Sequence, residues 1–305
     1  MFSYYFDTHS ASGVPPVAAL YDATGKAPRQ IKVVEDNAEL KKTLGQYALA
    51  PVEFIDVPLA DDPKTKLHGW MIKPTTFDAT KKYPTILYVY GGPGSQTGQD
   101  EWAGPNYLWF QHLAQQGYCI ISVDNRGTGA RGAAFKKSTY ANLGKLEIQD
   151  QMDVARWAGS QSFVDKSRIG MWGWSFGGYM TALALTKGAD LFKTGVAVAP
   201  VTNWRFYDTV YTERFLKTPQ ENPGGYDENS PVSHAAKLKG NFLMIHGTGD
   251  DNVHFQNAVA LEEAFIKANK QFSSFYYPNR NHGIYGGVTR LHLYRMMTEY
   301  FVKNL

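Results

Sequence analysis

Short apolar runs alternate with longer segments of helical periodicity over most of the chain. The runs have the length of buried strands and fall at residues 84–90, 118–124, 168–172, 194–199, 242–246 and 272–277. Between them, apolar positions recur at helical spacing in residues 107–116, 148–159, 178–187, 256–269 and 288–303. Alternating strands and helices are typical of a mostly parallel sheet with helices on both faces, so we expect an α/β fold. The last helix should cover the sheet with an apolar stripe made of Leu291, Leu293, Tyr294, Met297, Tyr300 and Phe301.

The first 50 residues show a different pattern. Asn37 is in the position of a helix N-cap and precedes a short helical segment with two leucines on one face. We therefore expect a lead-in segment over residues 1–50 and one larger domain over residues 51–305. Short strand-like runs precede the helix, at residues 2–6, 17–21 and 30–34.

Composition narrows the function classes. The 305 residues are 43% hydrophobic and 19% charged, which suffices for a sizeable core. The formal charge is +3, and no run of like charges indicates binding to nucleic acid or to a membrane surface. No apolar stretch reaches the length of about 18 residues that a membrane span needs, and no signal-peptide pattern follows Met1. The single cysteine, Cys119, lies in an apolar run and is expected in the core.

The sequence does not indicate a metal site or a dinucleotide-binding site. No spacing of ligating residues is typical of a metal site. Residues 127–132 match Gly-x-Gly-x-x-Gly, but a clean helix and a later acidic residue do not follow, as dinucleotide binding requires. We therefore expect no metal and no cofactor.

A nucleophile motif lies directly after one predicted strand. Residues 173–177 read Gly-Trp-Ser-Phe-Gly, in which the glycines allow a turn tight enough to raise the Ser175 hydroxyl above the strand end. The predicted strand 168–172 precedes the motif and a helix start follows it, which is the context that the motif needs. A solvated serine in a glycine-rich turn is the plain alternative.

A serine nucleophile needs an acid and a base from later strand ends, in that order. Asp250 and Asp251 follow the strand at 242–246, so either could be the acid, and one of them should form an Asx turn. Of the eight histidines, only His282 follows a later strand and lies in a loop. The other histidines precede the acid, follow it too closely, or lie within a strand or helix.

The same motif supplies candidate groups to bind an oxyanion. The backbone N–H of Phe176 is one donor, because it follows the nucleophile. The second should come from the loop after the strand at 84–90, where the Tyr90 hydroxyl could donate. Tyr90 could equally be an aromatic residue that ends a buried strand.

Seven further stretches, spread over about 200 residues, are distinctive when taken together. They are Tyr90–Gln96, Asp124–Gly129, Gly173–Tyr179, Val201–Trp204, Tyr207–Arg214, His246–Phe255 and Asn281–Gly283. In these residues and in their order, the chain resembles the prolyl oligopeptidase family, and within it the dipeptidyl peptidase IV branch.

The resemblance implies an α/β-hydrolase fold and a serine peptidase that cleaves after proline, or less readily alanine, through an acyl-enzyme. It implies Ser175 as nucleophile, Asp250 rather than Asp251 as the acid, and His282 as the base. Tyr90 would be an oxyanion donor.

The resemblance also implies a hydrophobic slot for a proline-sized ring, with Asn252 bonded to the substrate carbonyl beside it. An aromatic slot suits a rigid pyrrolidine ring, although ordinary core residues would show the same composition. Phe176 departs from the tyrosine often found after the serine. The implied slot residues are Phe176, Val201, Trp204, Tyr207, Tyr211 and Val253.

Members of this branch carry a long N-terminal β-propeller whose acidic residues bind the free amino terminus of the substrate. Residues 1–35 resemble its last strands, so we expect a fragment of a longer enzyme. The expected partner is a peptide with Pro or Ala at the cleavage position. A homodimer is possible, and the resemblance suggests a periplasmic or secreted bacterial enzyme. Two alternatives stay open: a carboxylesterase or acylaminoacyl peptidase of the same fold, and an inactive binding module.

Overall fold

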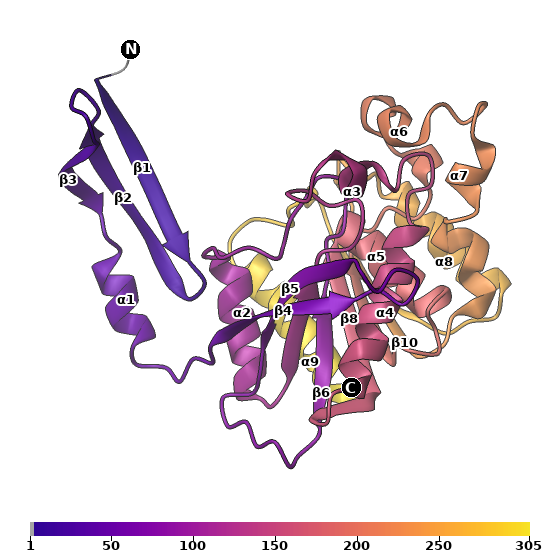
Figure 1. Ribbon diagram of the computed structural model, residues 1–305. Helices are drawn as coiled ribbons and strands as arrows, with labels where there is room; N and C mark the ends of the chain where they lie inside the picture. Colours follow the sequence, from indigo (N-terminus) through magenta and orange to yellow (C-terminus); the bar gives the residue numbers. More distant parts are fainter. Residues whose placement is uncertain (1–2) are drawn as a thin grey trace.

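A central sheet of eight strands forms the body of the protein in the computed structural model, which describes residues 3–305 (Figure 1). The strand order is β11-β10-β9-β8-β6-β7-β5-β4, and every neighbouring pair from β11 to β7 is parallel. The α/β-hydrolase fold is thus confirmed. The parallel strands are β6 (Tyr83–Tyr88), β7 (Cys119–Val123), β8 (Val164–Trp174), β9 (Thr194–Val198), β10 (Asn241–Gly247) and β11 (Ser273–Tyr277).

Side chains alternate between two core layers along each parallel strand, because successive residues of a strand point to opposite faces. Ile86, Ile120 and Trp172 belong to one layer, whereas Leu87 and Ile121 belong to the other. The first layer packs on α2 (Gly104–Gln115) and α9 (Thr289–Asn304), and the second on α4 (Leu146–Ser160), α5 (Phe176–Thr186) and α8 (Gln256–Lys267). Each of these five helices begins within three residues of the start that the sequence predicts.

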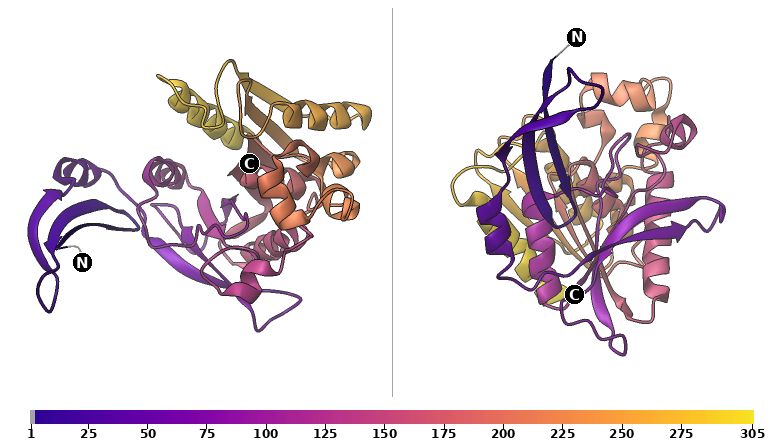
Figure 2. Two further views of the ribbon diagram at one scale, coloured as in Figure 1. Left: turned by 90° about the horizontal axis from the view of Figure 1, so that it is seen from above. Right: turned by 60° about the vertical axis from the view of Figure 1, so that its left-hand side comes forward.

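The lead-in segment forms a separate three-stranded antiparallel sheet and a short helix. Figure 2 shows this sheet projecting from the body, which it meets near the turn after β1. There Asp100 accepts a hydrogen bond from the Ser12 N–H at 2.7 Å. The elements are β1 (Tyr4–Ala11), β2 (Val14–Asp22), β3 (Arg29–Glu35) and α1 (Ala38–Leu44). Phe2, in the predicted strand 2–6, lies outside the described residues.

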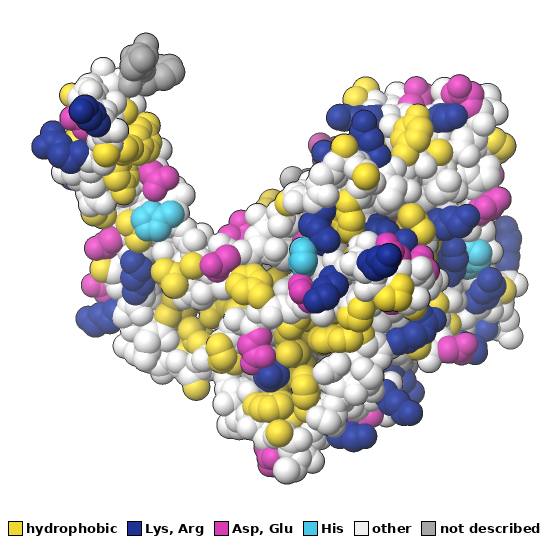
Figure 3. Space-filling model, viewed as in Figure 1, with side chains coloured by type: hydrophobic (Ala, Val, Ile, Leu, Met, Phe, Trp, Pro, Cys, Tyr) yellow, Lys and Arg dark blue, Asp and Glu magenta, His cyan; other side chains and the backbone are white. Residues whose placement is uncertain are grey.

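Apolar side chains are exposed on this small sheet, as Figure 3 shows at the upper left. Phe6 is 69% exposed and Val34 is 54% exposed. Asn37 does occupy the N-cap position of α1, but its side chain does not cap the helix and donates instead to the Pro16 carbonyl at 2.8 Å. The short helix is therefore tied to β2 rather than capped by its own sequence.

Several elements were not predicted from the sequence. The antiparallel strands β4 (Val52–Pro58) and β5 (Lys66–Ile72) extend the sheet beyond β7. The predicted stripe on α9 was wrong at Leu291, which is 52% exposed. Leu293, Met297 and Phe301, spaced by four, are buried, and Tyr294 and Tyr300 pack against the same core layer. The other unpredicted elements are α3 (Ala133–Lys137), α6 (Thr209–Leu216), α7 (Pro223–Asp227), and the 3-10 segments Trp204–Phe206 and Pro231–Lys237.

Close backbone contact between β5 and β7 generates a stability prediction. A Cβ at Gly69 would collide with the Ser122 carbonyl oxygen and lie 2.8 Å from Val123 Cα. Gly69→Ala should therefore lower the free energy of unfolding by about 1–3 kcal/mol, measured by urea denaturation. Gly45→Ala is the control, since Gly45 has φ −62° and its nearest neighbour is 3.5 Å from an added Cβ. An equal loss in both variants would contradict the packing argument.

Candidate active site

Ser175 lies on a sharp turn between β8 and α5, with φ 61° and ψ −117°. Added Cβ atoms at Gly173 and Gly177 would both collide with the Val89 carbonyl oxygen, so both positions require glycine. The Ser175 N–H donates to the Val198 carbonyl at 2.9 Å, and the hydroxyl does not cap α5. The turn therefore holds the serine backbone and leaves its hydroxyl available.

Asp250 and His282 form a hydrogen-bonded pair. His282 Nδ1 lies 2.7 Å from Asp250 Oδ2, and the fully buried carboxylate is an acceptor, so Nδ1 carries the proton and Nε2 is left to accept another. Asp250 Oδ1 accepts from the N–H groups of Asn252 and Val253 at 3.0 and 2.9 Å. One carboxylate thus forms both the expected Asx turn and the histidine contact, whereas Asp251 is exposed.

A second histidine approaches the same carboxylate. His246 Nε2 donates to the Val253 carbonyl at 2.8 Å and lies 3.3 Å from Asp250 Oδ2. Burial raises the pKa of Asp250, but the hydrogen bonds from His246 and His282 outweigh it and hold that pKa below its usual range. No pattern in the sequence indicates this contact, because a histidine inside a strand is ordinarily a core residue.

Trp174 links the histidine loop to the nucleophile turn. Its Nε1–H donates to the backbone carbonyl of His282 at 2.9 Å, and Trp174 is the neighbour of Ser175 in the chain. Among the hydrogen bonds of residues 3–305, none joins Ser175 to His282. Contacts of this kind commonly tighten only when substrate is bound.

Tyr90, two residues after β6, packs against Phe176, the residue after the serine. Their ring centroids are 6.1 Å apart, and an added Cβ at Gly92 would lie 2.8 Å from the Tyr90 ring. Burial raises the pKa of Tyr90, so its phenol keeps its proton and can donate. Phe176 is the first residue of α5, where backbone N–H groups lack a partner within the helix.

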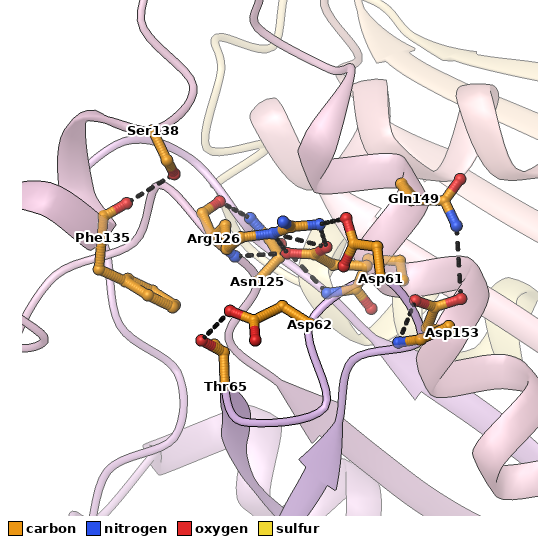
Figure 4. A network of polar contacts seen from close by, with 12 residues as sticks. Asp61, Asp62, Thr65, Asn125, Arg126, Phe135, Ser138, Gln149 and Asp153 are labelled. Carbon is orange, nitrogen blue, oxygen red and sulfur yellow. Dashed lines mark hydrogen bonds and ion pairs between the residues drawn. The ribbon is translucent and has the colours of Figure 1, made fainter.

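Two buried polar side chains, Asn125 and Gln151, form hydrogen bonds that hold the loop after Tyr90. Asn125 donates to the Gly91 carbonyl at 3.0 Å and accepts from Gln151 at 3.1 Å. The next residue, Arg126, forms an ion pair with the buried Asp150 carboxylate of α4. Its guanidinium also lies 3.0 Å from the Asp61 carboxylate (Figure 4). This network joins the Tyr90 loop to α4.

Aromatic rings gather beside the serine. Trp204 lies at the centre, with its ring centroid 5.5 Å from Phe176, 5.7 Å from Tyr207 and 5.8 Å from the stacked Tyr211. The Tyr207 hydroxyl donates to Asn252 Oδ1 at 2.7 Å, which brings Asn252 to the edge of this group. Val201 and Val253 are buried in the same core layer as Trp204 and Phe176.

This geometry can be compared with known proteins. The model of the prolyl oligopeptidase family matches residues 106–305. The chain belongs to the prolyl oligopeptidase family. Two curated relatives are prolyl endopeptidase FAP of Mus musculus, 40% identical over 289 residues, and dipeptidyl peptidase 4 of Felis catus, 39% identical over 279 residues. These alignments cover 93% and 90% of this chain but only 37% and 36% of the relatives.

A solved structure is also similar to this member of the family. Dipeptidyl peptidase 4 of Porphyromonas gingivalis superposes with a TM-score of 0.94 at 42% sequence identity. The match covers 99% of this chain and 42% of that protein. The 305 residues therefore span less than half the length of these relatives.

Within residues 3–305, no cluster of three or more His, Cys, Asp or Glu side chains is placed to hold a metal ion. None of the helices in that range combines the length and apolar character needed to cross a bilayer.

The buried carboxyl group of Glu147 lies near the aromatic group. Tyr179, whose ring centroid is 5.3 Å from that of Trp204, and Glu147 bond neighbouring residues of the chain. The Tyr179 hydroxyl lies 3.0 Å from the Leu143 carbonyl, and Glu147 accepts from the adjacent Gly144 N–H at 2.9 Å. The other Glu147 oxygen is buried without a hydrogen-bond partner. Burial raises the pKa of Glu147 to about 8.

The raised pKa generates a prediction about pH and stability. The folded state keeps the Glu147 proton that the unfolded state loses near pH 4.3, so stability should fall as the pH rises toward 8. Glu147→Gln should flatten this dependence and be the more stable form at pH 8 by more than about 1 kcal/mol. Urea denaturation from pH 5 to 8 measures it, with the exposed Glu299→Gln as control. Parallel curves for wild type and Glu147→Gln would refute a buried, protonated carboxyl.

Proposed function

We propose that this chain carries the catalytic domain of a serine peptidase that cleaves after proline, or less readily alanine, near the substrate N-terminus. The supporting observation is the hydrogen bond between Asp250 and His282. The backbone carbonyl of His282 also accepts a hydrogen bond from Trp174, the residue before Ser175. Residues 51–305 form the catalytic domain, and residues 1–50 form a lead-in segment that resembles the last strands of a propeller.

The proposed reaction has two steps. Ser175 Oγ attacks the scissile carbonyl while His282 Nε2 takes the hydroxyl proton, and Asp250 holds the imidazole. The Tyr90 hydroxyl and the Phe176 N–H bind the developing oxyanion. His282 then gives the proton to the leaving amine as the C–N bond breaks. Water, activated by the same histidine, hydrolyses the acyl-enzyme and restores Ser175.

The aromatic group around Trp204 is the proposed slot for the proline ring. Rings from Phe176, Tyr207 and Tyr211 approach Trp204 in tilted, edge-on and stacked orientations, which suit a rigid five-membered ring and leave little room for a long side chain. Asn252 at its edge would donate to the substrate carbonyl next to the slot.

The assembly and location are also proposals. A homodimer is supported by apolar side chains exposed along α9, where Leu291 is 52% and Val302 is 53% exposed. A periplasmic or secreted location rests on the family resemblance.

The nucleophile and the acid can be tested with a serine-directed phosphonate. We expect the probe to label Ser175 and no other serine, and Ser175→Ala to abolish labelling, by mass spectrometry. Asp250→Asn should slow labelling by about 100-fold or more, because the imidazole loses its orienting acceptor. The exposed neighbour Asp251→Asn is the matched control and should label at the wild-type rate. Reversed results for the two aspartates would overturn the acid assignment.

The substrate class can be tested with anilides. Gly-Pro-anilide should exceed Ala-Ala-anilide in kcat/KM by about tenfold, and Tyr211→Leu should reduce that ratio by removing one wall of the slot. Tyr140→Leu, at a tyrosine that is 52% exposed, is the control. Faster turnover of esters or acylaminoacyl substrates would favour those activities of the same fold.

N-acetyl-Gly-Pro-anilide tests recognition of the substrate amine. We expect a difference from the free amine of less than about fivefold, a barrier change below about 1 kcal/mol. The reason is that Asp208 caps α6 and Asp250 is bonded to His282, so neither of these two carboxylates is free to bind an amine. A strong preference for the free amine would place an amine site within these residues.

A further inference from the structure

Hydrogen bonds to the turn after β10 hold the start of the loop that carries His282: the Asn279 N–H donates to Thr248 Oγ1 at 2.9 Å, and the Gly249 N–H donates to the Arg280 carbonyl at 3.1 Å. The loop runs between β11 and α9, and Gly286 and Gly287 both have positive φ angles. Ile284 is its one fully buried apolar side chain, with φ 49°. A glycine-rich loop of this kind does not by itself fix a side chain, so contacts from outside must hold His282 in place.

Arg290, in the first turn of α9, makes an unusual contact with this loop. Its guanidinium carbon lies 4.5 Å from the centroid of the Trp174 ring and 4.4 Å from that of the Tyr285 ring. No carboxylate within residues 3–305 pairs with Arg290, and its Nε is buried without a hydrogen-bond partner. The Tyr294 hydroxyl also lies near this guanidinium, and the two aromatic faces are its contacts with the residues around Ser175 and His282.

Both rings are coupled directly to the histidine. Trp174 donates its indole N–H to the His282 carbonyl at 2.9 Å. Tyr285 covers Gly283, the residue after His282, so closely that an added Cβ there would collide with the ring. Arg290 thus joins the nucleophile turn, through Trp174, to the histidine loop, through Tyr285.

We propose that Arg290 is a positioning residue: by bridging Trp174 and Tyr285, its guanidinium holds His282 where Nε2 can reach the Ser175 hydroxyl. This inference rests on the proposed serine peptidase chemistry. A planar guanidinium can contact two ring faces at once, whereas the ammonium of lysine is a point charge. Arg290 itself touches neither substrate nor the reacting atoms in this role.

Kinetics of variants in the full chain test the proposal with Gly-Pro-anilide. Arg290→Met keeps the length of the side chain and removes the charge, and Tyr285→Ala removes one of the two rings. Each should lower kcat by about 5- to 30-fold and change KM by less than about twofold, because positioning affects the chemical step. Arg290→Lys should recover only part of the rate, while Tyr285→Phe, which keeps the ring, should match wild type.

The double variant gives the sharpest result. If the bridge is the cause, Arg290→Met with Tyr285→Ala should be no slower than the slower single variant. Multiplied effects, an unchanged kcat, or a loss confined to KM would each overturn the proposal. A loss confined to KM would mean that Arg290 binds substrate. Because Tyr285 is 63% exposed, its variants test the bridge even if Arg290→Met fails to fold.

A control and a spectroscopic readout separate positioning from general stability. Arg131→Met removes a comparable contact, 4.7 Å from the Phe135 ring, and should leave kcat unchanged. In proton NMR, the downfield Nδ1–H resonance of His282, identified by its loss in Asp250→Asn, should broaden in Arg290→Met and not in Arg131→Met. A sharp, unshifted resonance in Arg290→Met would contradict the inference. Absence of phosphonate labelling in wild type would instead refute the proposed function, which keeps the two failures distinct.

Discussion

The contact on which the site depends is the approach of β8 and α5 to the carbonyl oxygen of Val89. Gly173 and Gly177 both face that oxygen without room for a Cβ, so the backbone can turn sharply enough to raise Ser175 from the strand end. Val89 is followed by Tyr90, and Ser175 donates its N–H to Val198. The close contact at Val89 and the hydrogen bond to Val198 therefore fix the positions of Ser175, Tyr90 and β9 relative to one another.

The acid differs from the serine in how it is held. Asp250 is fixed by hydrogen bonds rather than by backbone packing: two N–H groups bind one oxygen, and His282 and His246 approach the other. These donors keep the buried carboxylate ionised, which outweighs the penalty of burial. Val253 is bonded through its N–H to Asp250 and through its carbonyl to His246, so the carboxylate and one wall of the proposed slot are fixed together.

Local pattern and chain order in the sequence predict the candidate nucleophile, acid and base. The Gly-x-Ser-x-Gly turn and the strand ends before Asp250 and His282 are local signals, and all three side chains follow parallel strands that share an edge. The edge strand β4 and its neighbour β5 escaped prediction because polar residues such as Glu53 and His68 interrupt their apolar pattern. Contacts between distant segments, such as Trp174 with His282, have no signal in the sequence, because they exist only once the sheet has assembled.

The parallel sheet holds β8, β10 and β11 in the order β11-β10-β9-β8, with β9 between β10 and β8, so backbone hydrogen bonds set the spacing of the strand ends. They do not set the loops beyond those ends. Ser175 follows its strand directly and Asp250 follows after two residues, whereas His282 lies five residues past Tyr277. Loop positions become less determined with distance from the sheet, since each added residue brings two free dihedral angles. The histidine is therefore the member of the three that most needs contacts from outside its own strand, and in this fold α9 and the residue before the serine are placed to provide them.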